Sequence, residues 1–450
     1  MDKVSAYMQE ITLEGFSGSI LVNYKGDVFS NGYGMNNSEA GIANTAETVY
    51  DMGSITKQFT AAGILKLEMQ GKLSVKNTLS SYFDNVPDDK KDITVHQLLT
   101  HSSGLIDGIG NDYDAISESE FKNQVFESDL LHKPGTKYYY SNAGYSLLSL
   151  IIEKVSGQSY EEYLSAQLFR PAGMGHTGYS KPDWNSQNIA TGYHGEHALG
   201  KPNEQNWDGN VPYLHLKGNG GILSTVEDLY KWHTILLTDE VLDSSAKEKY
   251  YYPHIKEDDE GRSHYGYGWA IFPTPRNTQL ITHNGGNGVF FADFLRYLSE
   301  DITIILMSNR SSAHTERVAM QIAGLLLVED FNPLLPSEMK EELEDSQIDD
   351  FVMDTFLAIR DGKPEIWETL LEGNASEEFL NAAPMDTHIK YFEKFKKRMD
   401  NGKLVSIAVE DDQIISEVTT PQESLLFILT FLETDEGDIK LDGIKVEENR

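Results

Sequence analysis

The feature that most constrains the fold is the placement of strand-like segments at both ends of the first 330 residues. Runs at 16–22 and 27–33 are rich in β-branched and aromatic residues, and the short polar turn between them predicts a hairpin. Strand-like runs return only at 279–283, 288–297 and 302–307. The segments between are mostly helical in periodicity. This order predicts an α+β fold, in which an antiparallel sheet is completed by both ends of the domain and covered by helices.

Three of the intervening segments carry clear helix signals. They are 55–69, which ends before Gly71, 143–155, which ends before Gly157, and 226–237. The last follows a Ser224-x-x-Glu227 pattern, which predicts a capping box.

A second domain is predicted after residue 330. Pro333 and Pro336 interrupt regular structure directly after an apolar helical run at 318–327. Residues 331–450 contain 29 acidic and 12 basic residues, so they carry half of the net charge of -34. We therefore predict two domains, 1–330 and 331–450.

The second domain is expected to be α+β as well, with helices first and strands after them. The expected helices are 338–359, 364–371 and 386–399, and the expected strands are 404–409, 413–418, 424–432 and 439–446. On pattern alone this order resembles NTF2-like or cystatin-like folds. Such a domain can cap a cleft, select substrates by length or form a homo-oligomer interface, and no residue in it decides among these roles.

The composition excludes several function classes. A net charge of -34 repels phosphate backbones and anionic lipids, so nucleic acid is not an expected partner. The chain has no run of about 18 apolar residues and no basic-then-apolar start, so we expect no membrane partner and a cytoplasmic location, or a secreted or periplasmic one if an export signal was removed. The absence of cysteine excludes disulfides, thiolate metal sites and a cysteine nucleophile.

Ser54 and Lys57 are spaced three residues apart, which on a helix places both side chains on one face. A lysine whose pKa is lowered by burial can take the proton of a serine nucleophile, and the apolar segment that follows can bury it. At a helix start, the Ser54 N–H can also face a developing oxyanion. The spacing alone is weak evidence, because a helix-capping serine explains it too. It also occurs at Ser119/Lys122, Ser244/Lys247 and Ser337/Lys340, which precede polar stretches.

Two further segments place reactive groups in loops. Tyr140 and Asn142 lie between an aromatic run and a helix, where a phenol can shuttle protons and an amide can bind a substrate carbonyl. The alternative is that Asn142 caps the helix and Tyr140 only packs.

The segment His283-Asn284-Gly285-Gly286 closes a strand-like run and opens a turn. An edge strand here can pair with a peptide-like substrate, while the Gly286 N–H supplies a second oxyanion donor. The alternative is a hairpin turn with an exposed histidine.

Taken in order, Ser54-x-x-Lys57, Tyr140-x-Asn142 and His283-x-Gly285 resemble the motifs of the penicillin-recognising serine hydrolases, which include class C β-lactamases, DD-peptidases, D-aminopeptidases and related esterases. The likeness covers about residues 10 to 328. It extends to the framework segments 93–105, 220–229 and 265–269. The resemblance implies a β-lactamase/DD-peptidase-like antiparallel sheet flanked by helices, with a helical subdomain.

Carried over residue by residue, the resemblance implies a serine hydrolase that needs no cofactor or metal. Ser54 would be acylated, Lys57 would accept its proton, and Tyr140 would shuttle protons to the leaving group and from water. Asn142 would hold the substrate amide. The N–H groups of Ser54 and Gly286 would form the oxyanion hole. The opposite wall would consist of His283, Asn284 and Gly285.

The third motif departs from class C β-lactamases, which have Lys-Thr-Gly where this chain has His283-Asn284-Gly285. A histidine attracts a substrate carboxylate less strongly than a lysine at neutral pH. We therefore expect small carboxylic esters or D-amino-acid peptides as substrates, with weak or absent β-lactamase activity.

Three competing hypotheses remain. A metallohydrolase would rest on His194-Gly195-Glu196-His197, which lacks the i, i+4 histidine pair of a helical zinc site. An α/β-hydrolase would need a Gly-x-Ser-x-Gly elbow, which the chain lacks. The third hypothesis is a catalytically silent ligand-binding or sensor protein that keeps the fold. Retention of Ser54, Lys57 and Tyr140 argues against the last, because a binding pocket has no need of an activated nucleophile.

Overall fold

The computed structural model describes residues 1–110, 112–182, 184, 188–195, 197–204, 212–258, 260–312, 314–338, 344–410, 413–433 and 439–449. Contacts divide the chain into two compact units. The first unit comprises Met1–Tyr193 and Ala198–Glu338, and the second comprises His194–His197 and Met339–Arg450. Each unit is described by itself.

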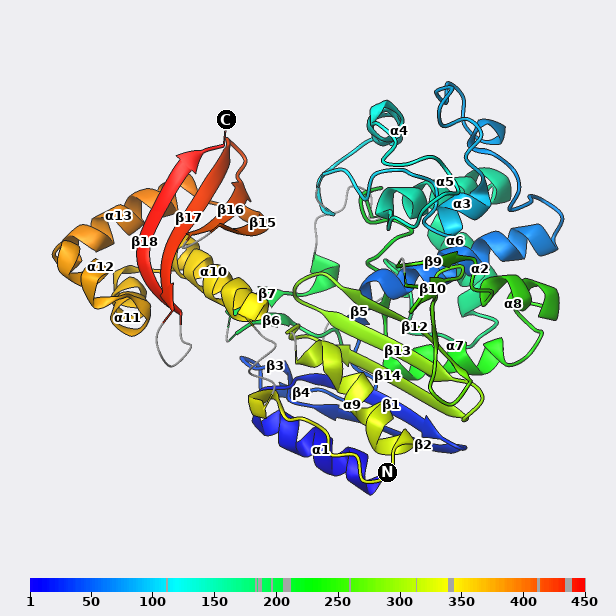
Figure 1. Ribbon diagram of the computed structural model, residues 1–450, viewed down its shortest axis with the longest axis horizontal. Helices are drawn as coiled ribbons and strands as arrows, with labels where there is room; N and C mark the ends of the chain where they lie inside the picture. The colour runs from blue at the N-terminus through cyan, green and yellow to red at the C-terminus, as the bar shows by residue number, and fades with distance from the viewer. Residues whose placement is uncertain are drawn as a thin grey trace. The chain divides into compact units, whose positions relative to one another are not determined.

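The first unit is built on an eight-stranded antiparallel sheet (Figure 1). Its strands are β1 Gly18–Tyr24, β2 Asp27–Tyr33, β9 Ile255–Lys256, β10 His264–Tyr265, β11 Ala270–Pro273, β12 Gln279–Gly286, β13 Phe291–Tyr297 and β14 Ile302–Ser308. Their order across the sheet is β2-β1-β14-β13-β12-β11-β10-β9. Strand β1 pairs with β14 from Gly18↔Ser308 to Tyr24↔Ile302, so strands from the two ends of the unit complete one sheet, as predicted.

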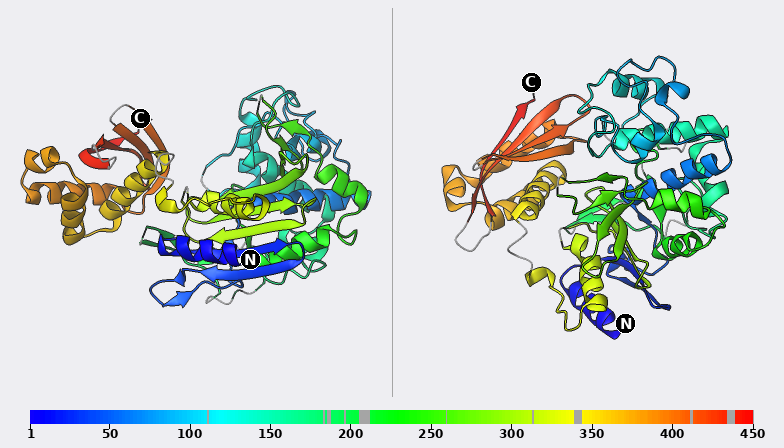
Figure 2. Two further views of the ribbon diagram at one scale, coloured as in Figure 1. Left: turned by 60° about the horizontal axis from the view of Figure 1, so that its bottom comes forward. Right: turned by 45° about the vertical axis from the view of Figure 1, so that its right-hand side comes forward.

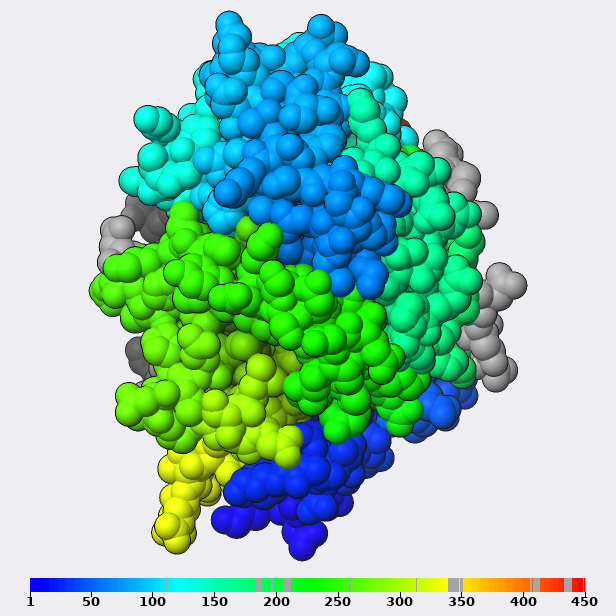
Figure 3. All heavy atoms as spheres, turned by 90° about the vertical axis from the view of Figure 1, so that its right-hand side faces the viewer, coloured from blue at the N-terminus to red at the C-terminus, as the bar shows by residue number. Residues whose placement is uncertain are grey.

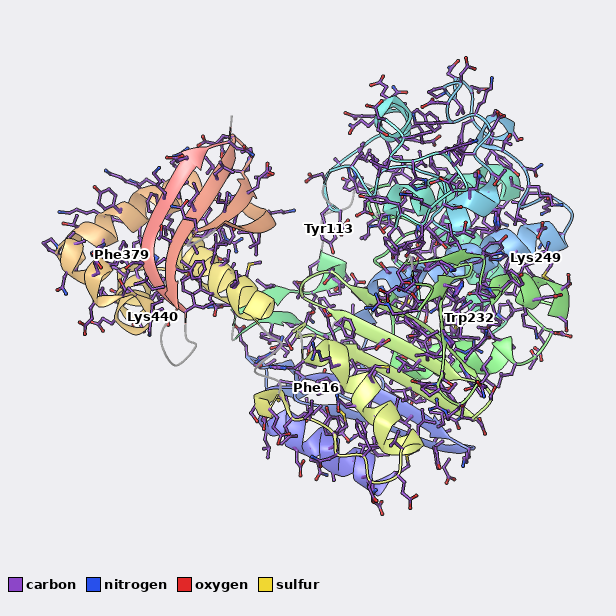
Figure 4. All side chains as sticks on the ribbon, viewed as in Figure 1. Phe16, Tyr113, Trp232, Lys249, Phe379 and Lys440 are labelled. Atoms are coloured by element: carbon purple, nitrogen blue, oxygen red, sulfur yellow. The ribbon has the colours of Figure 1, made fainter. Side chains whose placement is uncertain are left out.

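Helices cover both faces of this sheet. The helices of the first unit are α1 Asp2–Leu13, α2 Thr56–Met69, α3 Val95–Leu99, α4 Glu118–Glu127, α5 Asn142–Ser156, α6 Tyr160–Leu164, α7 Val226–Leu236, α8 Ser244–Tyr250 and α9 Thr315–Leu327. Helices α1 and α9 pack on one face and share one apolar core with it (Figure 1). Helix α7 packs on the other face, and its Trp232 is fully buried there (Figure 4).

Helices α2, α5 and α6 form a helical subdomain on the α7 side of the sheet, and segments from the first half and the middle of the chain lie against one another there (Figure 3). Helix α2 is buried along most of its length, because its apolar residues contact both α5 and α8. The remaining short elements are β3 Met35–Asn37, β4 Ile42–Ala43, β5 Tyr50–Asp51, β6 Gly192–His194, β7 His197–Gly200, β8 Leu223–Ser224, the 3₁₀ turns Gly53–Ile55, Leu79–Ser81, Pro202–Glu204 and Pro336–Glu338, and a π-turn Ser165–Phe169.

The second unit pairs a four-stranded antiparallel sheet with helices (Figure 2). Its helices are α10 Glu344–Asp361, α11 Pro364–Asn374, α12 Glu377–Ala382 and α13 Met385–Arg398, and its strands are β15 Lys403–Glu410, β16 Gln413–Thr419, β17 Ser424–Glu433 and β18 Ile439–Glu448. The strands follow one another in sequence order across the sheet. An apolar core that includes Trp367, Phe392 and Phe427 joins helices to strands. The predicted order of helices and then strands is present, and the likeness to NTF2-like or cystatin-like folds stays a prediction.

One local prediction is wrong, and one helix was not predicted. The cap of α7 is Thr225, whose hydroxyl accepts from the Asp228 N–H, because Ser224 lies in β8 and bonds to Thr177 instead. The N-terminal helix α1 was not expected, although its apolar residues Val4, Tyr7, Met8 and Ile11 have helical spacing and are buried against the sheet. The expected start of the helix at 338–359 lies partly outside the described residues. None of the helices that the structure describes is both long and apolar enough to cross a bilayer.

Candidate active site

Ser54 lies in the 3₁₀ turn that leads into α2, and it is partly exposed while its neighbours Gly53 and Ile55 are buried. Gly53 has φ +51, and a Cβ at this position would lie 2.7 Å from the backbone nitrogen of Gly286. Glycine is therefore required at 53, because the turn approaches β12 so closely. The turn presents the Ser54 hydroxyl at the start of a buried helix.

Lys57 lies one turn further along α2 and is fully buried. Its Nζ lies 3.0 Å from Ser54 Oγ, 2.7 Å from Asn142 Oδ1 and 2.8 Å from the Asn219 carbonyl oxygen. Burial lowers the pKa of Lys57 to about 7, even though the nearby carboxylates Asp107 and Asp112 oppose the shift. A neutral amine is therefore well populated near neutral pH.

Tyr140 lies directly before Ser141, the N-cap residue of α5. Its ring stacks on His101 at 4.2 Å between centroids, and Lys57 Nζ lies 4.6 Å from its ring centre. Burial raises the pKa of Tyr140 well above the usual range of a phenol, although a hydrogen bond with the Ser54 side chain acts in the opposite direction. The phenol is thus held protonated beside both the hydroxyl and the amine.

Asn142 is the first residue of α5. Its Oδ1 accepts from Lys57, and its Nδ2 donates to Asp107 Oδ1 at 3.0 Å. The side chain therefore holds the amine of Lys57 in position. Its predicted contact with a substrate amide stays a prediction.

His283 forms the opposite wall from within β12, and the alternative of an exposed turn histidine is wrong because the residue is buried. Its Nε2 is 2.9 Å from the Tyr265 hydroxyl, and its Nδ1 is 2.6 Å from the Asn284 carbonyl oxygen. Burial, and then the charge of Lys57, lower the pKa of His283 to about 4. The imidazole is consequently neutral at pH 7, so this wall lacks the cation that Lys-Thr-Gly would supply.

The two predicted oxyanion donors lie close together. A Cβ on Gly285 would lie 2.5 Å from the Ser54 nitrogen, so glycine at this position lets the β12 backbone approach the nucleophile. Gly286 follows at the end of β12, beside Gly53. The backbone N–H groups of Ser54 and Gly286 therefore border one small region next to Ser54 Oγ.

Asp51 connects the turn that holds Ser54 to the turn that follows Gly286. The carboxylate accepts from the Gly53 N–H at 2.7 Å through Oδ1 and from Asn287 Nδ2 at 3.2 Å through Oδ2. Asn287 in turn accepts from the N–H groups of Val289 and Phe290, which fixes the turn after Gly286. Burial raises the pKa of Asp51 to about 6, so the group is mainly ionised at neutral pH.

Sequence reasoning missed Asp51, Asn219 and Asp107. No local sequence pattern indicates that an aspartate such as Asp51 contacts the turn of a nucleophile. None indicates that a backbone carbonyl such as that of Asn219 binds a lysine. Asn219 lies in a Gly-rich run, 218–221, and that run was the one available signal of a backbone close to the site.

A cavity of about 1040 Å³ opens on Ser54 and Tyr140. Its wall near the nucleophile also includes Tyr138, Glu257 and His283. Among the residues that the structure describes, no group of three or more His, Asp or Glu side chains is arranged to hold a metal ion. Glu196 of the metal-site alternative lies outside those residues.

Two proteins of Bacillus subtilis are similar to this chain in sequence. Penicillin-binding protein 4* of Bacillus subtilis is 26% identical over 74% of this chain and 77% of its own length. A putative penicillin-binding protein, PbpX, of the same organism is 32% identical over 60% of this chain and 65% of its own length. The alignments thus span less than two thirds of some of these relatives.

Solved structures are similar as well. A penicillin-binding protein from Bacillus halodurans superposes with a TM-score of 0.61 at 27% identity, over 72% of this chain and 99% of its own. The octameric penicillin-binding protein homologue from Pyrococcus abyssi superposes with a TM-score of 0.63 at 25% identity, over 99% of both chains. Residues 3–329 match the family described as Beta-lactamase, so the chain belongs to the beta-lactamase family, among the homologues of penicillin-binding proteins.

Proposed function

We propose that this protein is a serine hydrolase that forms an acyl-enzyme on Ser54. The observation that carries the proposal is the hydrogen bonding of Lys57, whose Nζ contacts Ser54 Oγ and two carbonyl oxygens. A neutral amine has two N–H groups and one lone pair. The two carbonyls can only accept, so they take both N–H groups and direct the lone pair toward the serine hydroxyl.

In this mechanism the neutral Lys57 amine takes the Ser54 proton as Oγ bonds to the substrate carbonyl carbon. The carbonyl electron pair moves to oxygen, where the N–H groups of Ser54 and Gly286 stabilise the oxyanion. When the tetrahedral intermediate collapses, the leaving group takes the Tyr140 proton, and the Lys57 ammonium replaces it. Water then attacks the acyl carbon, gives one proton to this pair and releases the acid, and Ser54 is reprotonated.

The neutral wall at His283 bears on the substrate class. Both imidazole nitrogens are already paired, with the Tyr265 hydroxyl and the Asn284 carbonyl, and burial keeps the ring unprotonated, so this wall supplies no cation near neutral pH. We infer that the substrates are small carboxylic esters or D-amino-acid peptides and amides, and that β-lactams, whose carboxylate needs a cation, are turned over weakly or not at all.

The test is the initial rate of p-nitrophenyl butyrate hydrolysis at neutral pH by the wild type, Ser54→Ala and Ser119→Ala. Ser119 is the matched control, since it starts another Ser-x-x-Lys sequence but is exposed on α4. Loss of turnover in Ser54→Ala alone supports the proposal. Equal turnover in all three proteins would show that Ser54 is not the nucleophile of the activity. No turnover by the wild type would favour a narrow substrate or a silent ligand-binding protein instead.

We also infer that the chain forms a homo-oligomer. The support is the Pyrococcus abyssi homologue, described as octameric, whose likeness extends over 99% of both chains and so includes the second unit. Light scattering on the full chain tests this, and a monomeric mass at micromolar concentration would contradict it.

A further inference from the structure

The cavity at Ser54 continues past the catalytic residues to the α9 side of the sheet. Strand β11 pairs with β12 from Pro273↔Gln279 to Ala270↔Thr282. The β12 backbone beyond Thr282 therefore extends past the end of β11. Leu280, before this point, and His283, after it, both line the cavity. One continuous space thus borders both the nucleophile and the opposite face of the sheet.

The part of the cavity on the α9 side is apolar, and we call it the apolar arm. It is bordered by Leu280, Leu295, Tyr297, Met320, Leu327, Val328 and Phe331. Met320 and Val328 are 49% and 52% exposed, which leaves large apolar side chains facing the space. Phe331 packs on α9 at Gly324, where a Cβ would lie 2.4 Å from its ring, so glycine at 324 shapes the end of the arm.

The charged groups of the arm are neutralised. Arg276 is paired with Glu300 at 2.8 Å, and its guanidinium lies 5.6 Å from the ring centre of Tyr297. Asp293 is 6% exposed, and burial raises its pKa to about 8, so its carboxyl is largely protonated at pH 7. Among the described residues that line the arm, neither sign of charge is left uncompensated.

We propose that the apolar arm binds an uncharged aliphatic or aromatic chain of the substrate while the scissile carbonyl lies at Ser54. The inference rests on the proposed function and narrows its substrate class to esters or amides with an apolar substituent. A cavity of about 1040 Å³ is large enough for such a molecule. Because the space begins at the nucleophile, the chain and the carbonyl can be bound together. Without a free cation, the arm selects neutral chains over carboxylates and phosphates.

A chain-length series tests the arm during turnover. Values of kcat/KM are measured for p-nitrophenyl esters from acetate to octanoate, and for methyl to octyl butyrates, because the chain can lie on either side of the scissile bond. We expect kcat/KM to rise about two- to fourfold per methylene in one of these series, up to the length that the arm holds. In Met320→Lys, the ratio of kcat/KM for the longest ester to kcat/KM for the shortest ester of that series should fall at least tenfold.

The matched control is Leu237→Lys, which charges a 59% exposed leucine outside the cavity and should leave that ratio unchanged. The proposal would be overturned if kcat/KM of the wild type did not change with chain length in either series. It would also be overturned if the ratio for the longest and shortest esters were equal in the wild type and Met320→Lys.

A binding measurement separates the arm from the catalytic proposal. N-phenyl-1-naphthylamine is an uncharged apolar probe whose fluorescence rises on binding. We expect wild type and Ser54→Ala to bind it equally, octanol to displace it, and Met320→Lys to bind it at least fivefold more weakly. Probe binding of this kind without ester turnover would contradict the proposed function and leave the arm supported. Ester turnover with a flat series and no effect of Met320→Lys on the probe would overturn the arm and leave the function supported.

Discussion

Lys57 Nζ lies 3.0 Å from Ser54 Oγ, and the other two partners of this amine are the side-chain oxygen of Asn142 and the main-chain oxygen of Asn219. Neither oxygen can donate, so the serine hydroxyl is the one partner that can give a proton to the amine. This geometry supports the proposed proton transfer from Ser54 to Lys57, because burial also makes the neutral amine accessible.

The pH dependence of acylation follows from this arrangement. Below a pKa of about 7 the Lys57 ammonium cannot accept a proton, so kcat/KM for a neutral ester should rise from pH 5 to pH 8 with a midpoint near 7. His283, with a pKa of about 4, stays neutral over this range and adds no second limb. A stopped assay with buffers of constant ionic strength measures the profile. A flat profile, or one that falls over this range, would contradict the role of Lys57.

Replacement of the amine separates catalysis from stability. Lys57→Met should lower kcat/KM at least about a thousandfold, because the proton acceptor is lost. The same change removes a buried amine whose desolvation opposes folding, so the melting temperature should stay the same or rise. Parallel kinetics and thermal unfolding check both parts. Unfolding of the variant with wild-type activity in its folded fraction would refute the assignment.

Asp51 is expected to act as a positioning residue. Asp51→Asn cannot accept from both the Gly53 N–H and Asn287 Nδ2, so the two oxyanion donors should lose their fixed separation. We predict a fall in kcat of about 10- to 100-fold with a small change in KM, since the oxyanion exists only after attack.

Asn287→Ala serves as the partner variant for Asp51. If the two residues act through one contact, the double variant should lose little more activity than either single variant. Additive losses would show that the contact between them does not matter.

Asp293 should make the free energy of unfolding depend on pH. Its folded pKa of about 8 lies above the unfolded value of about 3.9, so between these values the folded protein holds a proton that the unfolded chain releases. The contribution of Asp293 to the free energy of unfolding is therefore fully present below about pH 4 and is lost as pH rises toward 8. Asp293→Asn does not titrate and should gain at least about 1 kcal/mol relative to wild type between pH 5 and pH 8. Urea unfolding at both pH values measures this, and a constant difference would mean that the carboxyl is ionised in the folded protein.

The sequence predicted the parts of the fold that depend on local patterns. Runs of β-branched and aromatic residues predicted β1, β2 and β14. The glycines that follow α2 and α5, Gly71 and Gly157, predicted where these helices end. The prediction that strands from both ends of the domain complete one sheet is confirmed, while the pairing of β1 with β14 itself was not predicted. Helix α1 escaped notice because four apolar residues among polar ones are a weak signal until a sheet face buries them.

The candidate site was predictable where motifs order the residues along the chain, as for Ser54, Lys57 and Tyr140. Asp51 and Asn219 were not predictable, because each acts through backbone atoms that approach from segments far apart in sequence. The neutral states of His283 and Asp293 depend on burial, which only the packed structure provides. The apolar arm is likewise assembled from β12, β13, α9 and the chain after it, with no local signature.

In the proposed mechanism Ser54 is an activated nucleophile. The most direct measurement is the intact mass of the protein after incubation with a fluorophosphonate at pH 8, followed by peptide mapping. We expect one stoichiometric adduct on the peptide that contains Ser54, slower labelling at pH 5, and no adduct in Ser54→Ala. Labelling of another serine, or no adduct in the folded wild type, would contradict this mechanism.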